Sequence, residues 1–139
     1  QPNLADKQLR WNPDCPVIRL SEIYYMLAEC ELRAGHKKEA AELINQVRAR
    51  NFENRNDPDP VTVDNLDEYR MLDEWMIEFL GEGRRRTDLI RWGAFTSESW
   101  WDHTPSNDRN MNRFQIPNSA ISANNLIKQN PGYGGTAEE

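Results

Sequence analysis

The sequence predicts an all-α fold that contains a helical hairpin, further helices and a long irregular C-terminal segment. Three observations predict this class. Apolar side chains recur with helical spacing near residues 20–34, 37–50 and 65–81. Gly35 follows the first of these stretches, at a position where many helices end. Beyond residue 92 the helical spacing is lost, and prolines and asparagines become frequent.

The first two predicted helices form an αα-hairpin. In the helix near 20–34, Ser21 is a candidate N-cap, and the apolar stripe consists of Leu20, Ile23, Tyr24, Leu27 and Ala28. In the helix near 37–50, the stripe consists of Ala40, Leu43, Ile44 and Val47. The small alanines allow the helices to approach closely. The pattern resembles one tetratricopeptide unit, and a single unit leaves an apolar face that needs a further partner.

The segment after this hairpin predicts a loop and two more helices. Residues 51–63 are rich in Asn, Asp and Pro, which indicates an exposed loop. Asn45 and Arg48 interrupt the mostly apolar second helix, and we interpret them as tethers for this loop rather than as ligand contacts. The third helix, near 65–81, has a predicted buried face of Tyr69, Leu72, Trp75, Met76 and Phe79. A short helix is expected near 84–92.

The whole chain, residues 1–139, is expected to form a single domain. Residues 1–17 form an irregular lead-in, and residues 18–92 form the helical core. Residues 93–133 are expected to wrap over the helices as ordered loop, and residues 134–139 to fray.

Composition and charge exclude several classes of protein. A net charge of −6 and a pI near 5.0 argue against a nucleic-acid partner, because such binding depends on neutralising phosphates. No apolar run approaches the roughly 20 residues of a membrane-spanning helix. Residues 1–7 lack the features of a signal peptide, so an export signal would lie upstream. Cys15 and Cys30 fit no zinc spacing, and two free thiols are favoured over a disulfide.

Charged residues predict a structural ion-pair network rather than a catalytic or phosphate-binding site. The expected members, at the seam between helices, are Glu22, Glu29, Glu78, Glu82, Arg85, Asp88 and Arg91. Glu74, Glu78 and Glu82 recur every four residues, and paired carboxylates can hydrolyse glycosides when they flank the bond. On one helix face these three would point the same way, which favours salt bridging.

Aromatic and polar residues near position 100 are the candidate ligand contacts. Trp100 and Trp101 can stack on the C–H faces of sugars, and Asn107 and Asp108 can bond hydroxyl groups. The competing interpretation is that the tryptophans pack onto the helical core, and we favour it. No catalytic residue, metal site or cofactor is expected, because the two histidines have no partners at ligand or triad spacing.

Three segments together resemble the SusD/RagB family. The first is RLSEIYYMLAE at residues 19–29, continued by INQVRAR at residues 44–50. The second is EFLGEGRRRTDLIRWG at residues 78–93. The third is FQIP at residues 114–117, followed by QNPGY at residues 129–133. The resemblance spans nearly the whole chain, and the arginine run and the tryptophan pair look most similar to the starch-type branch.

The resemblance implies a surface-exposed outer-membrane lipoprotein of Bacteroidetes, anchored by a lipid-bearing cysteine upstream of this chain. Such a protein captures glycans or other nutrients and partners a TonB-dependent, SusC-like transporter. The chain would be the C-terminal part, and the N-terminal portion of the same protein would be a further partner. The family's ligand contacts lie largely before these motifs, so none is assigned here.

A non-enzymatic, nutrient-binding accessory protein is therefore the expected function, with an oligosaccharide as the expected ligand. Two alternatives stay open. A tetratricopeptide-like protein–protein interaction module would explain the hairpin but not the tail from Pro117 to Tyr133. A glycoside hydrolase rests on the row of carboxylates alone.

Overall fold

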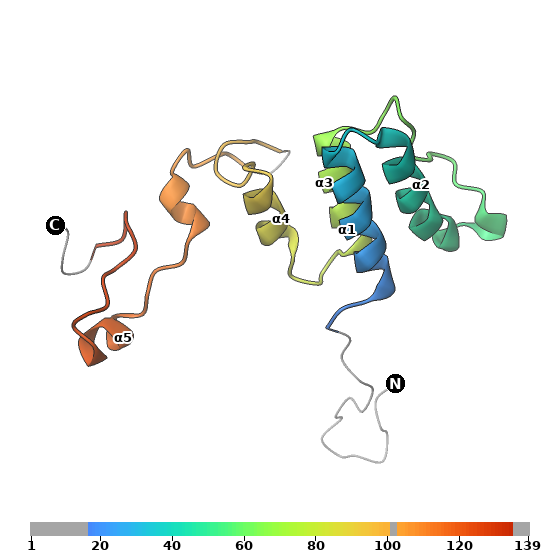
Figure 1. Ribbon diagram of the computed structural model, residues 1–139. Helices are drawn as coiled ribbons and strands as arrows, with labels where there is room; N and C mark the ends of the chain where they lie inside the picture. Colours follow the sequence, from blue (N-terminus) through green and yellow to red (C-terminus); the bar gives the residue numbers. More distant parts are fainter. Residues whose placement is uncertain (1–16, 101–102, 135–139) are drawn as a thin grey trace, which may run out of the picture. The chain divides into compact units, whose positions relative to one another are not determined.

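The computed structural model describes residues 17–100 and 103–134. The chain divides into two compact units between Met71 and Leu72, and each is described by itself. The elements, in order, are α1 (Leu20–Arg33), α2 (Lys37–Arg48), η1 (Ala49–Asn51), η2 (Glu53–Arg55), α3 (Glu68–Glu78), α4 (Arg85–Arg91), η3 (Arg109–Asn112) and α5 (Asn118–Ala123) (Figure 1). The described residues contain helices and one isolated bridge, between Trp100 and His103, but no strand. The prediction of an all-α fold is confirmed.

The turn between α1 and α2 is a Schellman motif centred on Gly35. The His36 amide donates to the Glu31 carbonyl at 2.9 Å, and the Gly35 amide donates to the Leu32 carbonyl at 3.0 Å. Gly35 has φ +87°, a left-handed conformation that glycine adopts at little cost. The turn therefore satisfies carbonyl groups at the end of α1 and reverses the chain into α2.

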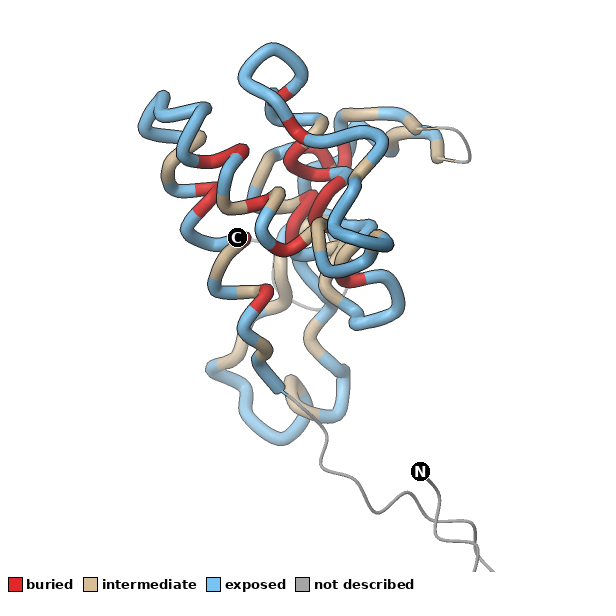
Figure 2. Tube along the Cα trace, turned by 90° about the vertical axis from the view of Figure 1, so that its right-hand side faces the viewer, coloured by how far each residue is buried: buried red, intermediate tan, exposed pale blue. Residues whose placement is uncertain are grey.

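Small and aromatic residues fill the contact between α1 and α2. Tyr25 and Ala28 of α1 are 1% and 0% exposed, and Ala40 and Ile44 of α2 are both 0% exposed. Ala41 and Val47 are also buried on α2, in agreement with most of the predicted stripe of that helix. Figure 2 shows that buried positions are concentrated in the helices and that the connecting segments are largely exposed.

The predicted stripe of α1 is wrong in most of its members. Leu20, Ile23 and Leu27 are 70%, 50% and 48% exposed, whereas Tyr25 and Ala28 are buried. The helix has apolar residues on more than one side, and periodicity alone does not say which side faces α2. The small Ala28 permits closer approach to the alanines of α2 than leucine would. An apolar row on α1 is consequently exposed in this chain.

The predicted face of α3 also needs correction. Tyr69 and Met76 are 62% and 39% exposed. The buried residues of α3 and the turn after it are Met71, Leu72, Glu74, Trp75 and Phe79. The Trp75 and Phe79 rings lie 5.1 Å apart between centroids, one helical turn from each other. The buried face is thus rotated away from Tyr69, and it includes a carboxylate that has an interaction partner.

The second unit has a small core around α4. Leu72, Leu89 and Ala94 are buried, and Trp92, Phe95 and Trp100 pack against them while partly exposed. The chain after α4 runs through turns to η3 and then to α5, a six-residue helix that the sequence did not predict.

Side chains near the C-terminus hold an extended segment in place. Gln129 accepts a hydrogen bond from the Ile116 amide at 2.8 Å and donates one to the Ile116 carbonyl at 2.9 Å. Asn130 donates to the Phe114 carbonyl at 2.7 Å, and the Tyr133 hydroxyl donates to the Arg113 carbonyl at 2.6 Å. We call this set of contacts the C-terminal clamp. It joins the two halves of the third sequence motif.

Among the helices that the structure describes, none combines the length and the apolar character needed to cross a membrane.

Candidate functional site

Trp100 lies against the core of the second unit. Its ring is partly buried against the cluster of Leu72 and Leu89. The ring of His103 stacks on it with centroids 3.9 Å apart and planes 12° apart, and the Arg85 guanidinium lies 6.0 Å from its centroid. Two backbone hydrogen bonds, of 3.3 and 2.8 Å, join Trp100 and His103. Trp100 therefore makes the packing contacts of a core residue, and Trp101 lies outside the described residues.

Asn107 and Asp108 lie in the exposed segment before η3, and the two residues make different contacts. The Asp108 carboxylate accepts the Asn110 amide at 2.9 Å and so caps η3. Asn107 has φ +55°, and its backbone amide donates to the Thr96 carbonyl at 2.8 Å. That bond holds the segment against the turn after α4. Asn107 lines a pocket, and Trp100 is not among the described residues that line it.

This polar pocket has a volume of about 340 Å³, which is within the range of small-molecule sites. The described residues that line it are Ile90, Gly93, Thr96, Ser97, Asn107, Arg109 and Asn112. They come from the end of α4, the turn after it and η3. Amide, hydroxyl and guanidinium groups dominate the lining, and no carboxylate is among its described residues.

Two groups of the polar pocket stand out. The Asn112 side-chain oxygen is buried and accepts no hydrogen bond from the residues that the structure describes. Arg109 is the one charged residue among the described lining, and it is exposed. Sequence reasoning found Asn107 but missed Arg109 and Asn112. The only local signal for them was the density of asparagines between residues 107 and 112.

Asp88 is the centre of an ion-pair cluster on α4. It is 1% exposed, and it receives Arg84 at 3.0 Å and Arg91 at 3.0 Å. Asp88 and Arg91 belong to the network expected from the sequence, whereas Arg84 was not included. The cluster links Arg84, the residue before α4, to Arg91, the last residue of the helix.

The other residues of the expected network have the following contacts. Arg85 donates to the Leu72 carbonyl at 2.6 Å and lies 3.9 Å from the Asp73 carboxylate. Glu29 pairs with Arg33 at 3.0 Å along α1. The three remaining members also have interaction partners, and they are Glu22, Glu78 and Glu82. Arg85 was expected to bind a carboxylate of the network, and its close hydrogen bond is to a backbone carbonyl instead.

A second concavity lies at the turn between α3 and α4. Its volume is about 410 Å³, and Trp75, Phe79 and Arg84 are among its lining residues. The Arg84 guanidinium lies 3.9 Å from the Trp75 ring centroid and 5.0 Å from that of Phe79. Both rings are nearly fully buried, at 1% and 3% exposed. Their faces are therefore covered by protein, and they offer no platform for stacking a sugar.

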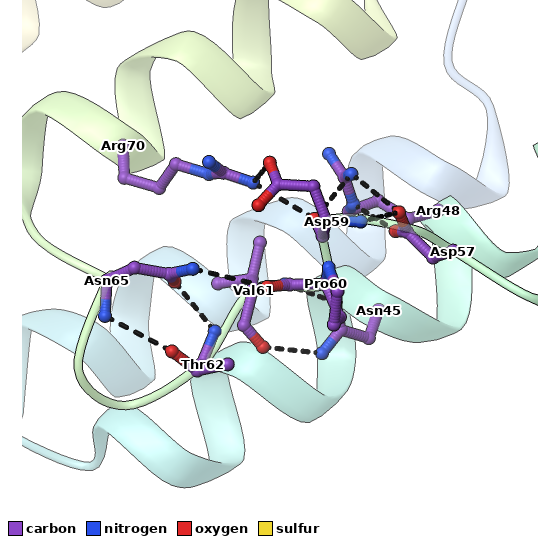
Figure 3. Close-up of polar contacts among 9 residues, drawn as sticks. All are labelled: Asn45, Arg48, Asp57, Asp59, Pro60, Val61, Thr62, Asn65 and Arg70. Carbon is purple, nitrogen blue, oxygen red and sulfur yellow. Dashed lines mark hydrogen bonds and ion pairs between the residues drawn. The ribbon is translucent and has the colours of Figure 1, made fainter.

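The first unit contains a polar network that ties the loop after α2 to that helix (Figure 3). Asn45 donates to the Val61 carbonyl at 2.7 Å and accepts the Val61 amide at 2.9 Å. Thr62 and Asn65 exchange hydrogen bonds in the same loop, at 2.7 and 3.2 Å. Val61 is 2% exposed, so this pairing carries the chain into the core.

Arg48 binds the other end of the loop (Figure 3). It pairs with both oxygens of Asp57, at 2.7 and 3.1 Å, and donates to the Asp59 carbonyl at 2.8 Å. Arg70 of α3 binds the Asp59 carboxylate at 2.9 Å. The hydrogen bond from Arg48 lowers the pKa of Asp57 below its usual value, and it outweighs the opposing effect of desolvation. The interpretation of Asn45 and Arg48 as loop tethers is confirmed.

Comparison with known proteins identifies the class to which this fold and its motifs belong. Residues 5–133 match the SusD family. The chain is 36% identical over 127 residues to the starch-binding protein SusD of Bacteroides thetaiotaomicron, covering 86% of this chain and 22% of that protein. It is 38% identical over 78 residues to the SusD-like protein P25 of Formosa agariphila, covering 55% of this chain and 15% of that protein.

The chain belongs to the SusD family. It spans about a fifth or less of the length of these two curated relatives.

Proposed function

We propose that the chain is the C-terminal part of a glycan-binding accessory protein without catalytic activity, in a TonB-dependent outer-membrane uptake system. The observation that carries this proposal is the family match over residues 5–133. One relative is named as a starch-binding protein, which supports a glycan as the ligand class. The carboxylates that could suggest hydrolysis, Glu74, Glu78 and Glu82, each have an interaction partner, which favours binding over catalysis.

The proposed protein is displayed at the cell surface and held in the outer membrane by a lipid-bearing cysteine upstream of this chain. Its proposed partner is a SusC-like TonB-dependent transporter. Co-purification from detergent-solubilised outer membranes tests both points, with the intact protein as bait. We expect a large β-barrel protein to be recovered with it. Recovery of the protein in the soluble fraction without a barrel would contradict the proposal.

Within this chain, Trp100, Trp101, Asn107 and Asp108 remain the proposed ligand contacts. Trp100 stacks on His103, has the Arg85 guanidinium 6.0 Å from its ring centroid and packs against the core, so it is only partly available to a sugar. Binding through these residues alone should therefore be weak, because one or two contacts do not offset the loss of ligand freedom. Strong binding would need the N-terminal portion of the protein.

A tetratricopeptide-like interaction module is the second candidate. The exposed apolar row of α1 favours it, because single helical hairpins bury such rows against a neighbour. The two candidates differ in their ligands. An interaction module captures a protein and ignores a glycan panel, whereas the proposed accessory protein, tested intact, binds the glycan.

A further inference from the structure

We infer that the exposed apolar face of α1 is a docking surface for the upstream part of the same polypeptide, which places a second amphipathic helix on it. We call this face the α1 row, and its members are Leu20, Ile23, Met26, Leu27 and Cys30. The inference rests on the proposed function only because it treats this chain as the C-terminal part of a longer protein. It adds the surface on which the upstream part binds.

The α1 row lies on one side of the helix. Its members recur three or four residues apart, which is the spacing that brings side chains to a common helix face. All five are exposed, and none of them is charged. Tyr25 and Ala28 are buried and form the side of α1 that packs on α2. Helix α1 is therefore apolar on two sides, and α2 covers only one of them.

The exposed cysteine in the α1 row indicates that a partner covers this face. Cysteine is among the residue types that are most often fully buried, and an exposed thiol is open to oxidation. Cys30 is a free, exposed thiol one turn beyond Leu27. Contiguous apolar patches on a protein surface usually mark an interaction site. A partner that covers the row would bury Cys30 together with its apolar neighbours.

The family comparison indicates which partner this is. Nearly the whole chain matches the SusD family, at residues 5–133, yet the aligned parts are 22% and 15% of the two curated relatives. Most of the polypeptide in those relatives therefore lies outside the part that this chain resembles. A single tetratricopeptide-like hairpin also needs neighbouring helices to cover its apolar faces. The upstream part of the same protein can supply such a neighbour.

The position of the α1 row favours a tethered partner. The row begins at the first residue of α1, and the exposed Val17 and Ile18 lead directly into it. A segment joined to the chain on this side is held near the row, so it docks at a high effective concentration. Because none of the five side chains can pair with a charge, the segment must present an apolar stripe. An amphipathic helix meets this requirement.

The test measures how fast iodoacetamide alkylates Cys30 in the reduced intact protein and in the reduced 139-residue chain. Trypsin cuts after Arg19 and Arg33, so mass spectrometry detects Cys30 in peptide 20–33, separately from Cys15. The chain is studied at a concentration where it sediments as a monomer and keeps its helix signal. We expect alkylation to be about tenfold slower or more in the intact protein, because the docked helix must first open. Equal rates would overturn the inference.

A variant in the α1 row tests whether this face provides the protection. Ile23→Glu places a charge within the row, and it should raise the alkylation rate of Cys30 in the intact protein toward that of the chain. Gln46→Glu makes the same charge change at an exposed position of α2 and should leave the rate unchanged. Circular dichroism of the same samples detects unfolding. If Ile23→Glu lowers the helix signal, Ile23→Ala replaces it and should raise the rate by a smaller factor.

Three other occupants of the α1 row would each give a different result, and each result would overturn the inference. If Cys30 is also protected in the monomeric chain, a segment of this chain covers the row. If the protection in the intact protein increases with its concentration, a second copy covers the row. If Cys30 reacts rapidly in the purified intact protein but slowly in outer membranes, a membrane partner covers the row.

Failure of this inference is distinguishable from failure of the proposed function, because glycan binding by the intact protein is measured separately. If the intact protein binds a glycan and Cys30 reacts equally fast in it and in the chain, the inference is wrong and the proposed function stands. If Cys30 is protected in the intact protein and no glycan binds, the docking surface stands and the proposed function is wrong.

Discussion

The side chain of Asn45 pairs with the backbone of Val61 through both of its polar atoms, at 2.7 and 2.9 Å (Figure 3). Helix α2 thus supplies the hydrogen bonds that a neighbouring strand would supply in a sheet. The amide is the right group because it donates and accepts at the correct separation, and no carboxylate or hydroxyl reproduces both.

Asn45→Leu should lower the free energy of unfolding of the first unit by about 1–3 kcal/mol, because it leaves the Val61 amide and carbonyl without these partners. Urea unfolding followed by circular dichroism measures the change. Gln46→Leu, at the next and exposed position, is the matched control and should be near neutral. Equal midpoints for the two variants would show that the loop does not depend on Asn45.

Asp57 should make the stability of the first unit depend on acid. Its pKa in the folded chain is below the ordinary value of 3.8, so its contribution is complete above that value. The contribution is lost as pH falls from about 4 through the folded pKa, because the protonated group no longer pairs with Arg48. Asp57→Asn should flatten the pH dependence of the melting midpoint in this acid range. Asp64→Asn, an exposed acid in the same loop, should leave the profile unchanged.

Asp88→Asn should destabilise the second unit by about 3 kcal/mol, because it removes the charge that a nearly buried position shares with two arginines. The loss should show as a lower thermal midpoint with little change in helix content at low temperature. Asp73→Asn is the control, since its side chain is 60% exposed and its contact with Arg85 is long, at 3.9 Å. A loss below about 1 kcal/mol for Asp88→Asn would mean that the cluster behaves as an exposed pair.

The exposed row of α1 should make the isolated chain self-associate. Ile23 and Leu27 are 50% and 48% exposed and lie one helical turn apart. Ile23→Glu combined with Leu27→Lys should shift sedimentation toward the monomer without a loss of helix signal, because the change is on a face that does not pack on α2. If the unchanged chain and the double variant sediment identically across a concentration series, this row does not drive self-association.

The isolated chain should bind neutral glycans weakly or not at all. Isothermal titration against starch, inulin, mannan and host-type glycans measures this directly. The expected result is no saturable binding heat at micromolar ligand. Trp100 already stacks on His103 and packs against the core, so it is only partly available to a sugar. A micromolar dissociation constant that is lost in Trp100→Ala or Trp101→Ala would contradict the expectation and would place the main site here.

Local pattern was sufficient to predict the helices and the loop tethers. The predicted ranges near 20–34, 37–50, 65–81 and 84–92 match α1 to α4 to within a few residues. Asn45 and Arg48 were predictable because each breaks an otherwise apolar stripe beside a Pro- and Asp-rich loop. The buried faces of α1 and α3 were not predictable from local pattern. Each helix has apolar residues on more than one side, and tertiary contacts decide which of them are buried.

The polar pocket was only partly predictable for a related reason. Its described lining spans residues 90 to 112, and turns rather than one helix bring these positions together. Asn107 was found because polar residues near tryptophans suggest a sugar site. Arg109 and Asn112 have no local signal beyond the density of asparagines between residues 107 and 112, and their place at the pocket appears only after folding.

The C-terminal clamp has a consequence for where the chain can change in length. Gln129 forms hydrogen bonds with both the amide and the carbonyl of Ile116. The residues that make these contacts must therefore keep their positions opposite one another. Residues 118–128, including α5, form a loop whose two ends are held together by the hydrogen bonds between Ile116 and Gln129. Lengthening a loop whose ends are held adds little entropic penalty. An epitope or a fluorescent reporter can therefore be inserted in residues 118–128 without breaking the hydrogen bonds of the C-terminal clamp.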